Sequence, residues 1–404
     1  MKIGIIGAGA SGLFAAICAA RTARQLNKNV QITVYERNAV PGRKLLATGN
    51  GRCNFSNASI DGAAYHGSER LFSAVYPQFT NDDAVDFFRS VGLRSFADEA
   101  GRLYPMSRKS ESVLAVLLFQ CEQCGVGFRY GYDVRTVARR GQGFLLNGEE
   151  FADRLIVAAG GKASPQHGTD GSVFGILQGL GVSFTPLAPA LTAIELTGFP
   201  KRLKGVRAQG QVRILTDGKC IARDRGELQF TDYGVSGIPA MTVSEAAGKN
   251  AAHAEVVLEL VPEIPFRAML NECLAFRKKF PSACVKLLLQ GYLPEKLAQW
   301  LPTLADVSPE ALLGDLSEGT LRGIVCKVKD LRYPVKTVKG FSFAQVTAGG
   351  VDDGAVIPET LACRKIPGLF FCGEVLDING DCGGYNLQWA WSSGYVAGKN
   401  SVLK

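Results

Sequence analysis

The sequence predicts an α/β fold built around a dinucleotide-binding domain that longer insertions interrupt. The stretch 3–36 has the order of strand, glycine-rich turn, helix, strand and acidic residue that is typical of a dinucleotide-binding unit. Two later apolar segments, 154–159 and 368–373, run into glycines, as further strands of the same sheet would. Between about 187 and 340, alternating segments and then short helical ones replace this pattern.

The turn after the first strand contains three glycines whose spacing suits a pyrophosphate. Gly7 permits the tight turn, Gly9 lets the backbone approach the phosphates, and Gly12 lets the helix pack closely on the sheet. The start of the helix offers free N–H groups and the positive end of the helix dipole. Glu36 ends the second strand, where an acid accepts hydrogen bonds from ribose hydroxyls and repels a 2′-phosphate.

Composition and charge narrow the class of protein. With 47% hydrophobic and 20% charged residues, the 404-residue chain is typical of a soluble globular protein with two or three domains. No segment is long and apolar enough to span a bilayer, and the glycine unit explains the apolar start better than a signal peptide does. We therefore expect a cytoplasmic protein with no membrane partner. The net charge of +8 suits an anionic cofactor or substrate, but no basic run is dense enough to predict nucleic-acid binding.

The cysteines and histidines predict neither a disulfide framework nor a metal centre. The 11 cysteines are odd in number and scattered, and the 3 histidines are widely separated. Cys121 and Cys124 form the only CxxC, on a predicted helix over 111–124 without a second pair or a nearby histidine. This favours a structural role for the pair over a redox or metal role.

The change of pattern along the chain predicts three parts. We expect a nucleotide-binding domain over 1–186 plus 341–404, a β-rich domain over 187–262 plus 325–340, and a helical insertion over 263–324. Segments such as 211–215 and 255–260 favour antiparallel strands. The chain therefore starts and ends in the same domain.

A polar, glycine-rich loop over 41–54 follows the ribose-binding acid directly. Ordering such a loop costs conformational entropy and gains little burial, so we expect a ligand to hold it. Arg43 and Lys44 are placed to neutralise phosphate, and Arg52 and Asn54 to reach a cofactor ring or a substrate.

A second polar segment lies near the C-terminus, where a strand ends at Gly373 and a helix starts near Asn386. Asp377, between them, is placed to hold a ribityl hydroxyl. The helix start after Gly384 would direct its N–H groups at negative charge, as on the N1 and C2=O edge of a reduced flavin.

Four blocks of the sequence resemble the BaiN-like, aminoacetone-oxidase-like family of FAD-binding proteins. They are KLLATGNGRCN (44–54), GELQFTDYGVSG (226–237), QVTAGGV (345–351) and GEVLDINGDCGGYNLQWAWSSGYVAG (373–398), and the likeness extends from residue 3 to residue 398. The resemblance implies a split FAD-binding Rossmann domain of the glutathione-reductase type, an inserted β-barrel-like domain and a small helical subdomain.

The resemblance also implies which residues contact FAD. Val134, in a strand-like stretch after Tyr132, is the implied backbone contact of the adenine. At Asp232 the sequence departs from the family pattern, in which many relatives have histidine within a GELLFTH-type block. If this block lines the substrate cavity, we expect the substrate or its protonation to differ. The implied cofactor-binding residues are Gly7, Gly9, Ala10, Ser11, Gly12, Glu36, Arg37, Arg43, Lys44, Gly51, Arg52, Cys53, Asn54, Val134, Ala159, Gly160, Gly161, Gly373, Glu374, Asp377, Gly384, Tyr385, Asn386 and Leu387.

The sequence identifies no catalytic acid or base. Arg52, Cys53, Tyr385 and Asp232 are the candidates. Cys53 next to Arg52 is open to two interpretations: a thiol of lowered pKa, or a small buried residue beside the ring, which is favoured. No second GxGxxG unit is present, so NADH or NADPH would bind only transiently against the flavin.

The resemblance implies an FAD-dependent oxidoreductase of a small organic molecule. We expect reduction of an activated C=C bond, as in an enone of steroid or bile-acid type, with hydride from the reduced flavin and a proton from a polar residue or water. An amine oxidase with an aminoacetone-like substrate and O2 as acceptor is the alternative. An FAD-dependent RNA-modifying protein would need a basic, aromatic-lined surface on 187–340; the cations there are Lys201, Arg202, Lys204 and Arg207, without clear aromatic interleaving.

Overall fold

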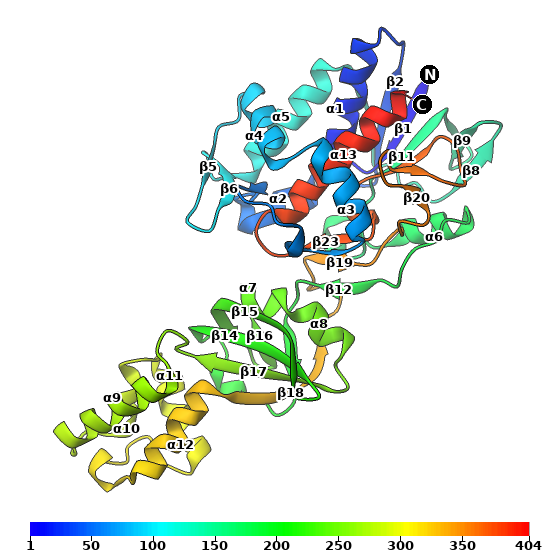
Figure 1. Cartoon of the computed structure of the whole chain (residues 1–404). Coiled ribbons are helices and arrows are strands. Elements are labelled where there is room, and N and C mark those ends of the chain that lie inside the picture. The colour runs from blue at the N-terminus through cyan, green and yellow to red at the C-terminus, as the bar shows by residue number, and fades with distance from the viewer. Residues whose placement is uncertain (404) are drawn as a thin grey trace. The chain divides into compact units, whose positions relative to one another are not determined.

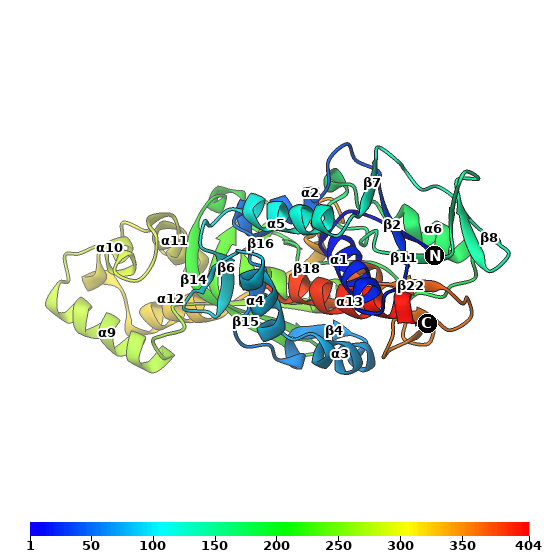
Figure 2. The same cartoon turned by 90° about the horizontal axis from the view of Figure 1, so that it is seen from above.

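The computed structural model describes residues 1–403 and divides into two compact units (Figure 1). The first unit comprises Met1–Pro189 and Ala344–Lys404, and the second is Ala190–Phe343. The chain begins and ends in the first unit, as both views show (Figures 1 and 2). Each unit has its own hydrophobic core.

A seven-stranded sheet with the order β20-β21-β22-β11-β1-β2-β7 forms the centre of the first unit. In its parallel part, Ile5 is paired with Val34 on one side and Ile156 on the other, and all three are fully buried. Strands covered on both faces have this continuous apolar character. Because β1, β2, β7, β11 and β22 are parallel, their carboxyl ends meet at one edge. The strands are β1 (Lys2–Ile6), β2 (Gln31–Glu36), β7 (Gly127–Tyr130), β11 (Arg154–Val157), β20 (Val356–Ile357), β21 (Ala362–Cys363) and β22 (Leu369–Phe371).

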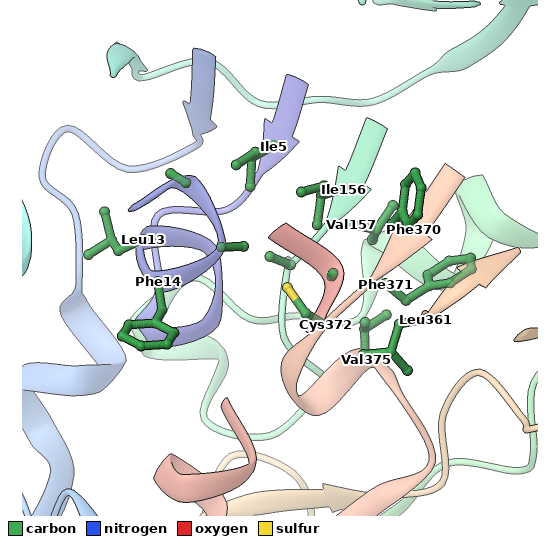
Figure 3. Packing of buried hydrophobic residues seen from close by; sticks show 14 of the residues in the cluster. Ile5, Leu13, Phe14, Ile156, Val157, Leu361, Phe370, Phe371, Cys372 and Val375 are labelled. Atoms are coloured by element: carbon green, nitrogen blue, oxygen red, sulfur yellow. The ribbon is translucent and has the colours of Figure 1, made fainter. Parts of the chain in front are cut away.

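Two helices from opposite ends of the chain pack together against this sheet. They are α1 (Ala10–Gln25) and α13 (Tyr385–Leu403). Small residues permit their close approach, since a Cβ at Gly398 would collide with the backbone of Ala15. The predicted strand, glycine turn, helix and strand over 3–36 are thus confirmed. Figure 3 shows the resulting core, with Ile5, Leu13, Phe14, Ile156 and Phe371.

The structure corrects the sequence prediction in two places of this unit. Residues 41–54 are not one loop, because Arg43–Ala47 form the helix α2, in which Leu45 is buried. Val134 is not in a strand; it lies between β7 and β8 (Val137–Arg140), in a turn that side-chain hydrogen bonds hold.

The other elements of the first unit surround the sheet. They include two three-stranded antiparallel sheets, β10-β9-β8 and β3-β6-β5, and the two-stranded sheet β23-β4. The bounds are β3 (Ser56–Asn57), β4 (Tyr65–Gly67), α3 (Glu69–Val75), α4 (Asn81–Ser90), β5 (Ser95–Ala97), β6 (Arg102–Pro105), α5 (Ser110–Gln123), β9 (Gly143–Leu146), β10 (Glu150–Ala152), α6 (Ser172–Gly179), β12 (Ala188–Ala190), β19 (Val346–Ala348) and β23 (Ile378–Gly380).

A closed six-stranded barrel, β13-β16-β15-β14-β17-β18, is the centre of the second unit. β14 and β15 form a long hairpin in which Val212 and Ile214 are fully buried and Arg213 between them is partly exposed. This period of two is the alternation expected for a strand with one face inside a barrel. The strands are β13 (Ile194–Leu196), β14 (Arg207–Thr216), β15 (Lys219–Phe230), β16 (Gly234–Ser236), β17 (Ala254–Leu260) and β18 (Leu331–Val338).

Helices between β17 and β18 share one core with the barrel. Lys329, which is almost fully buried, joins the two parts: its ammonium group donates to the carbonyls of Val261 and Ile264 and pairs with Glu259 at 2.8 Å. The last of these helices, Glu318–Lys329, extends five residues beyond the predicted helical stretch, which ended at 324. The helices between β17 and β18 are α9 (Phe266–Lys279), α10 (Val285–Gln290), α11 (Glu295–Trp300) and α12 (Glu318–Lys329), whereas α7 (Ile238–Thr242) and α8 (Ser244–Lys249) lie between β16 and β17.

The CxxC pair lies at the end of α5. Cys121 is buried, with its thiol 3.7 Å from the carbonyl oxygen of Leu13, and Cys124 is half-buried. Within residues 1–403, no three metal-binding side chains are gathered, and no helix is long and apolar enough to cross a membrane. The packing of Cys121 supports a structural role for the pair.

Candidate cofactor-binding site

The three glycines after β1 have different surroundings. Gly7 has φ +102°, and a Cβ there would lie 2.6 Å from the carbonyl oxygen of Ala158. A Cβ at Gly12 would collide with the carbonyl oxygen of Gly7, which explains how α1 packs so closely. At Gly9, by contrast, a Cβ would meet no protein atom within 4 Å. Gly9 is the N-cap of α1, and the first N–H groups of a helix have no partner within the helix, so a phosphate would bind favourably there.

Glu36 is fixed beside this turn, with only 7% of its surface exposed. One carboxylate oxygen accepts a hydrogen bond from the Ala8 N–H at 2.9 Å. The other accepts from the backbone and the side-chain amide of Asn38, at 2.8 and 2.7 Å. The carboxylate is thus held where the sheet edge meets the glycine turn.

Arg37 is occupied by two carboxylates. Its guanidinium lies 2.7 Å from Asp170 and 3.2 Å from Asp133. Burial alone would raise the pKa of Asp170, but hydrogen bonds from Arg37 and Ser172 lower it to about 2. Arg37 therefore ties two loops together and offers less net charge to a phosphate than its position in the sequence suggests.

Lys44 and Glu374, two predicted cofactor residues, bind each other. The Lys44 ammonium lies 2.6 Å from one carboxylate oxygen of Glu374, whose other oxygen accepts from the Thr347 N–H at 2.9 Å. The Thr347 hydroxyl oxygen accepts from the N–H groups of Lys162 and Ala163, at 2.7 and 2.9 Å. This network fixes the segment after Gly161 against the segment after β22. The sequence interpretation missed Thr347, although it lies in the block 345–351.

The start of α13 lies against the segment 54–56. A Cβ at Gly384 would collide with the carbonyl oxygen of Ser56 and lie 2.8 Å from the side-chain oxygen of Asn54. That Asn54 oxygen is buried and has no hydrogen-bond partner among residues 1–403. A buried acceptor beside the free N–H groups of a helix start fits a ring with both donor and acceptor atoms on its edge, as the flavin ring has.

The remaining predicted cofactor residues also lie in the first unit. The N–H of Gly373 donates to the Ser393 hydroxyl at 2.9 Å, and Asn386 binds both backbone groups of Gly380. Val134 is 8% exposed. The others are Ala10 and Ser11 at the start of α1, Arg43, Gly51, Ala159, Gly160, Asp377 and Leu387.

Two of the four catalytic candidates lie at the surface of the first unit: Arg52 is exposed and Tyr385 is partly exposed. The Arg52 guanidinium lies 5.7 Å from the centre of the Tyr104 ring. Burial, and then the nearby carboxylates Asp381 and Asp61, raise the pKa of Tyr385, so its hydroxyl stays protonated. A further pair that the sequence did not reveal is His66 with Asp381, at 2.9 Å.

Asp232 is the one candidate that lies in the second unit. Its side chain is 43% exposed and pairs with Lys204 at 2.9 Å. The hydrogen bond from Lys204 holds the pKa of Asp232 below its usual value. Asp232 is therefore an anion in the folded protein.

The hypothesis that Cys53 has a lowered pKa is wrong. The residue is fully buried, and burial raises the pKa of its thiol to about 12, although a hydrogen bond with Thr48 opposes the shift. The neighbouring Arg52 does not compensate, because its side chain is turned to the surface. Cys53 is a small buried residue rather than a nucleophile.

The thiol-specific reagent of Ellman is expected to react with the folded protein at the exposed Cys220 and Cys326 and to spare Cys53. The exposed thiols are accessible to the reagent, whereas Cys53 is buried and its raised pKa keeps the thiol neutral. Mass spectrometry of the labelled peptides measures each site, with denatured protein as the control. Labelling of Cys53 in folded protein as fast as that of Cys220 would contradict this assignment.

The Rossmann-type fold, together with the family and the relatives described next, identifies the protein as an FAD-dependent oxidoreductase. The chain belongs to the family described as HI0933-like protein Rossmann domain, whose model matches residues 1–400. This confirms the resemblance to the BaiN-like flavoproteins.

Three relatives and one solved structure are similar over nearly the full length. The chain is 36% identical over 406 residues to 3-dehydro-bile acid delta(4,6)-reductase of Clostridium scindens, with 98% of each chain covered. It is 29% identical to the ribosomal RNA dihydrouridine synthases of Escherichia coli K12 and Haemophilus influenzae Rd, covering 98% and 97% of this chain and 97% and 96% of theirs. The 3-ketosteroid delta1-dehydrogenase of Sterolibacterium denitrificans has a similar fold, with a TM-score of 0.51 and 13% identity over 99% of each chain.

Proposed function

We propose that this protein is an FAD-dependent reductase of C=C bonds conjugated to a carbonyl group, with a 3-oxo steroid or bile acid as its substrate class. The observation that carries the proposal is the 36% identity, over 98% of both chains, to an enzyme named as a reductase of 3-dehydro-bile acids. The cofactor residues of the first unit support the same chemistry, because they fit a flavin.

FAD is proposed to lie along the carboxyl edge of the first unit's sheet. The open space at Gly9 would receive the pyrophosphate, Glu36 would hold the ribose, and Asn54 with the start of α13 would hold the ring. Bound there, FAD supplies the hydride for the reduction. The N–H groups at the start of α13 would stabilise negative charge on the ring edge.

The proton is proposed to come from water or from Tyr385. A phenol whose pKa is raised by burial remains protonated at neutral pH, as a donor must. Arg52 stays a second candidate in the first unit. Asp232 is assigned to substrate choice, since an exposed anion in the second unit gives that unit a different preference from one with histidine.

The finer organisation is proposed from the family resemblance. Residues 1–186 plus 341–404 are the split FAD domain of the glutathione-reductase type, 187–262 plus 325–340 the barrel domain, and 263–324 the helical insertion. NADH or NADPH is proposed as a transient electron donor.

Reduction of uridine in RNA is the second candidate, favoured by the 29% identity to two ribosomal RNA dihydrouridine synthases. The C5=C6 bond of uracil is also conjugated to a carbonyl, so the two candidates share one chemistry. Of the four cations in 201–207, however, Lys204 pairs with Asp232 and Arg207 with Glu227. These carboxylates offset charge that RNA phosphates would need, and the small-molecule substrate is preferred for this reason.

Anaerobic half-reactions test the proposal. The protein is reduced with NADH, NADPH or light, and then mixed with a 3-oxo-Δ4 steroid, a uridine-containing RNA fragment or air. We expect the flavin to be re-oxidised faster by the steroid than by air. The C4=C5 double bond of the steroid should be a single bond in the product. Faster re-oxidation by RNA would transfer the assignment to the second candidate. Bleaching by aminoacetone followed by rapid re-oxidation in air would make the protein an amine oxidase.

A further inference from the structure

We propose that Asn147 is a positioning residue for the adenosine half of FAD, because its side chain holds the turn 131–136 in the shape that presents the Val134 backbone to adenine. The inference rests on the proposed function, which makes FAD the cofactor. Asn147 lies outside the sequence blocks that resemble the flavoprotein family.

The Asn147 side chain makes three hydrogen bonds to the backbone of this turn. Its carbonyl oxygen accepts from the N–H groups of Arg135, at 2.8 Å, and Thr136, at 3.1 Å. Its amide nitrogen donates to the carbonyl of Asp133 at 2.9 Å. One side chain therefore binds the backbone on both sides of Val134.

The Val134 backbone itself is left without a partner. None of the hydrogen bonds within residues 1–403 uses its N–H or its carbonyl, although the residue is 8% exposed. Nearly all buried backbone groups in proteins are paired, so an unpaired donor and acceptor on one residue call for a ligand. Adenine presents an acceptor, N1, next to a donor, the 6-amino group, and these match one N–H and one carbonyl.

The turn also lies at the ribose-binding end of the sheet. The N–H of Tyr132 donates to the carbonyl of Glu36 at 2.9 Å, and that of Gly131 to the carbonyl of Asn38 at 3.0 Å. Asp133 pairs with Arg37 at 3.2 Å. An open pocket of about 500 Å³ is lined by Gly131, Tyr132, Asp133, Arg135, Thr136 and Asn147.

Asparagine suits position 147 for a second reason. The residue has φ +48° and begins the tight turn Asn147-Gly148 between β9 and β10. Asparagine and glycine adopt this left-handed conformation more readily than other residues. Asn147→Gly therefore removes the three side-chain hydrogen bonds while keeping the backbone unstrained.

The test compares the affinities of apoprotein variants for FAD and for FMN, which lacks the adenosine half. Asn147→Gly is expected to weaken FAD binding by about tenfold or more, the effect of losing roughly 1.4 kcal/mol of pre-organisation. FMN affinity and the absorption spectrum of the bound flavin are expected to stay as in the parent protein. Asn147→Asp keeps the two acceptor bonds and loses the donor, so its FAD affinity should fall between those of the parent protein and Asn147→Gly.

Asn27→Gly is the matched control, since Asn27 is also left-handed, at φ +51°, but is exposed at the end of α1 and far along the chain from the turn. Equal FAD affinity of Asn147→Gly and Asn27→Gly would overturn the proposal. So would an equal loss of FAD and FMN binding, which would indicate a general loss of structure. Failure of the parent protein to bind FAD would instead contradict the proposed function.

Discussion

A valine at position 9 is expected to give a folded protein that no longer binds FAD. Gly9 has φ −83° and ψ −171°, which valine adopts without strain, and a Cβ there meets no protein atom within 4 Å. The fold itself therefore does not require glycine at position 9. The branched side chain would extend into the space proposed for the pyrophosphate, which in this type of turn approaches the second glycine closely.

The absorbance of flavin per mole of purified Gly9→Val protein, and its titration with added FAD, measure the effect. Gly175→Val is the control, because Gly175 lies on the exposed side of α6 and its Cβ also meets no protein atom. Circular dichroism establishes that both variants are folded. Retention of FAD by folded Gly9→Val would show that the cofactor does not use this turn.

Gly12→Val, in contrast, is expected to lower the stability of the fold, and this effect does not depend on the cofactor. A Cβ at Gly12 would collide with the Gly7 carbonyl oxygen and lie 3.2 Å from the Cβ of Ala158. To relieve this, α1 must move away from the sheet, and α13 with it. Overpacking alone costs about 1–3 kcal/mol, and displacement of the backbone adds to that, out of a total stability of about 5–15 kcal/mol.

Thermal unfolding of the apoprotein measures this effect without a contribution from FAD. We expect a clearly lower midpoint for Gly12→Val than for Gly175→Val, which introduces the same side chain into a helix without a collision. A midpoint of Gly12→Val apoprotein equal to that of the control would contradict the close packing of α1 on the sheet. The two substitutions, three residues apart, thus separate binding of the cofactor from folding.

Local sequence pattern predicted the elements that are proposed to bind the cofactor. The apolar run before Gly7, the three glycines and the strand ending at Glu36 are determined by residues near one another in the chain, and each was found at its predicted place. The helix at 43–47 was missed because the surrounding glycines and charges outweighed a run of good helix formers.

Contacts between distant segments were not predictable in the same way. The shape of the turn at Val134 depends on Asn147, and the position of Glu374 depends on Lys44 and Thr347. Nothing local to these residues indicates their partners. The pKa of Cys53 is a similar case, because the sequence shows the adjacent Arg52 and the fold supplies the burial that dominates.

The central claim, that the first unit holds one FAD, is tested most directly by the flavin that the purified protein carries. The folded protein is desalted and denatured, and the released flavin is identified by chromatography and quantified per chain. The account predicts FAD at about one molecule per chain, regained when apoprotein is mixed with FAD. FMN in its place, or no flavin bound even after FAD is added to folded protein, would contradict it.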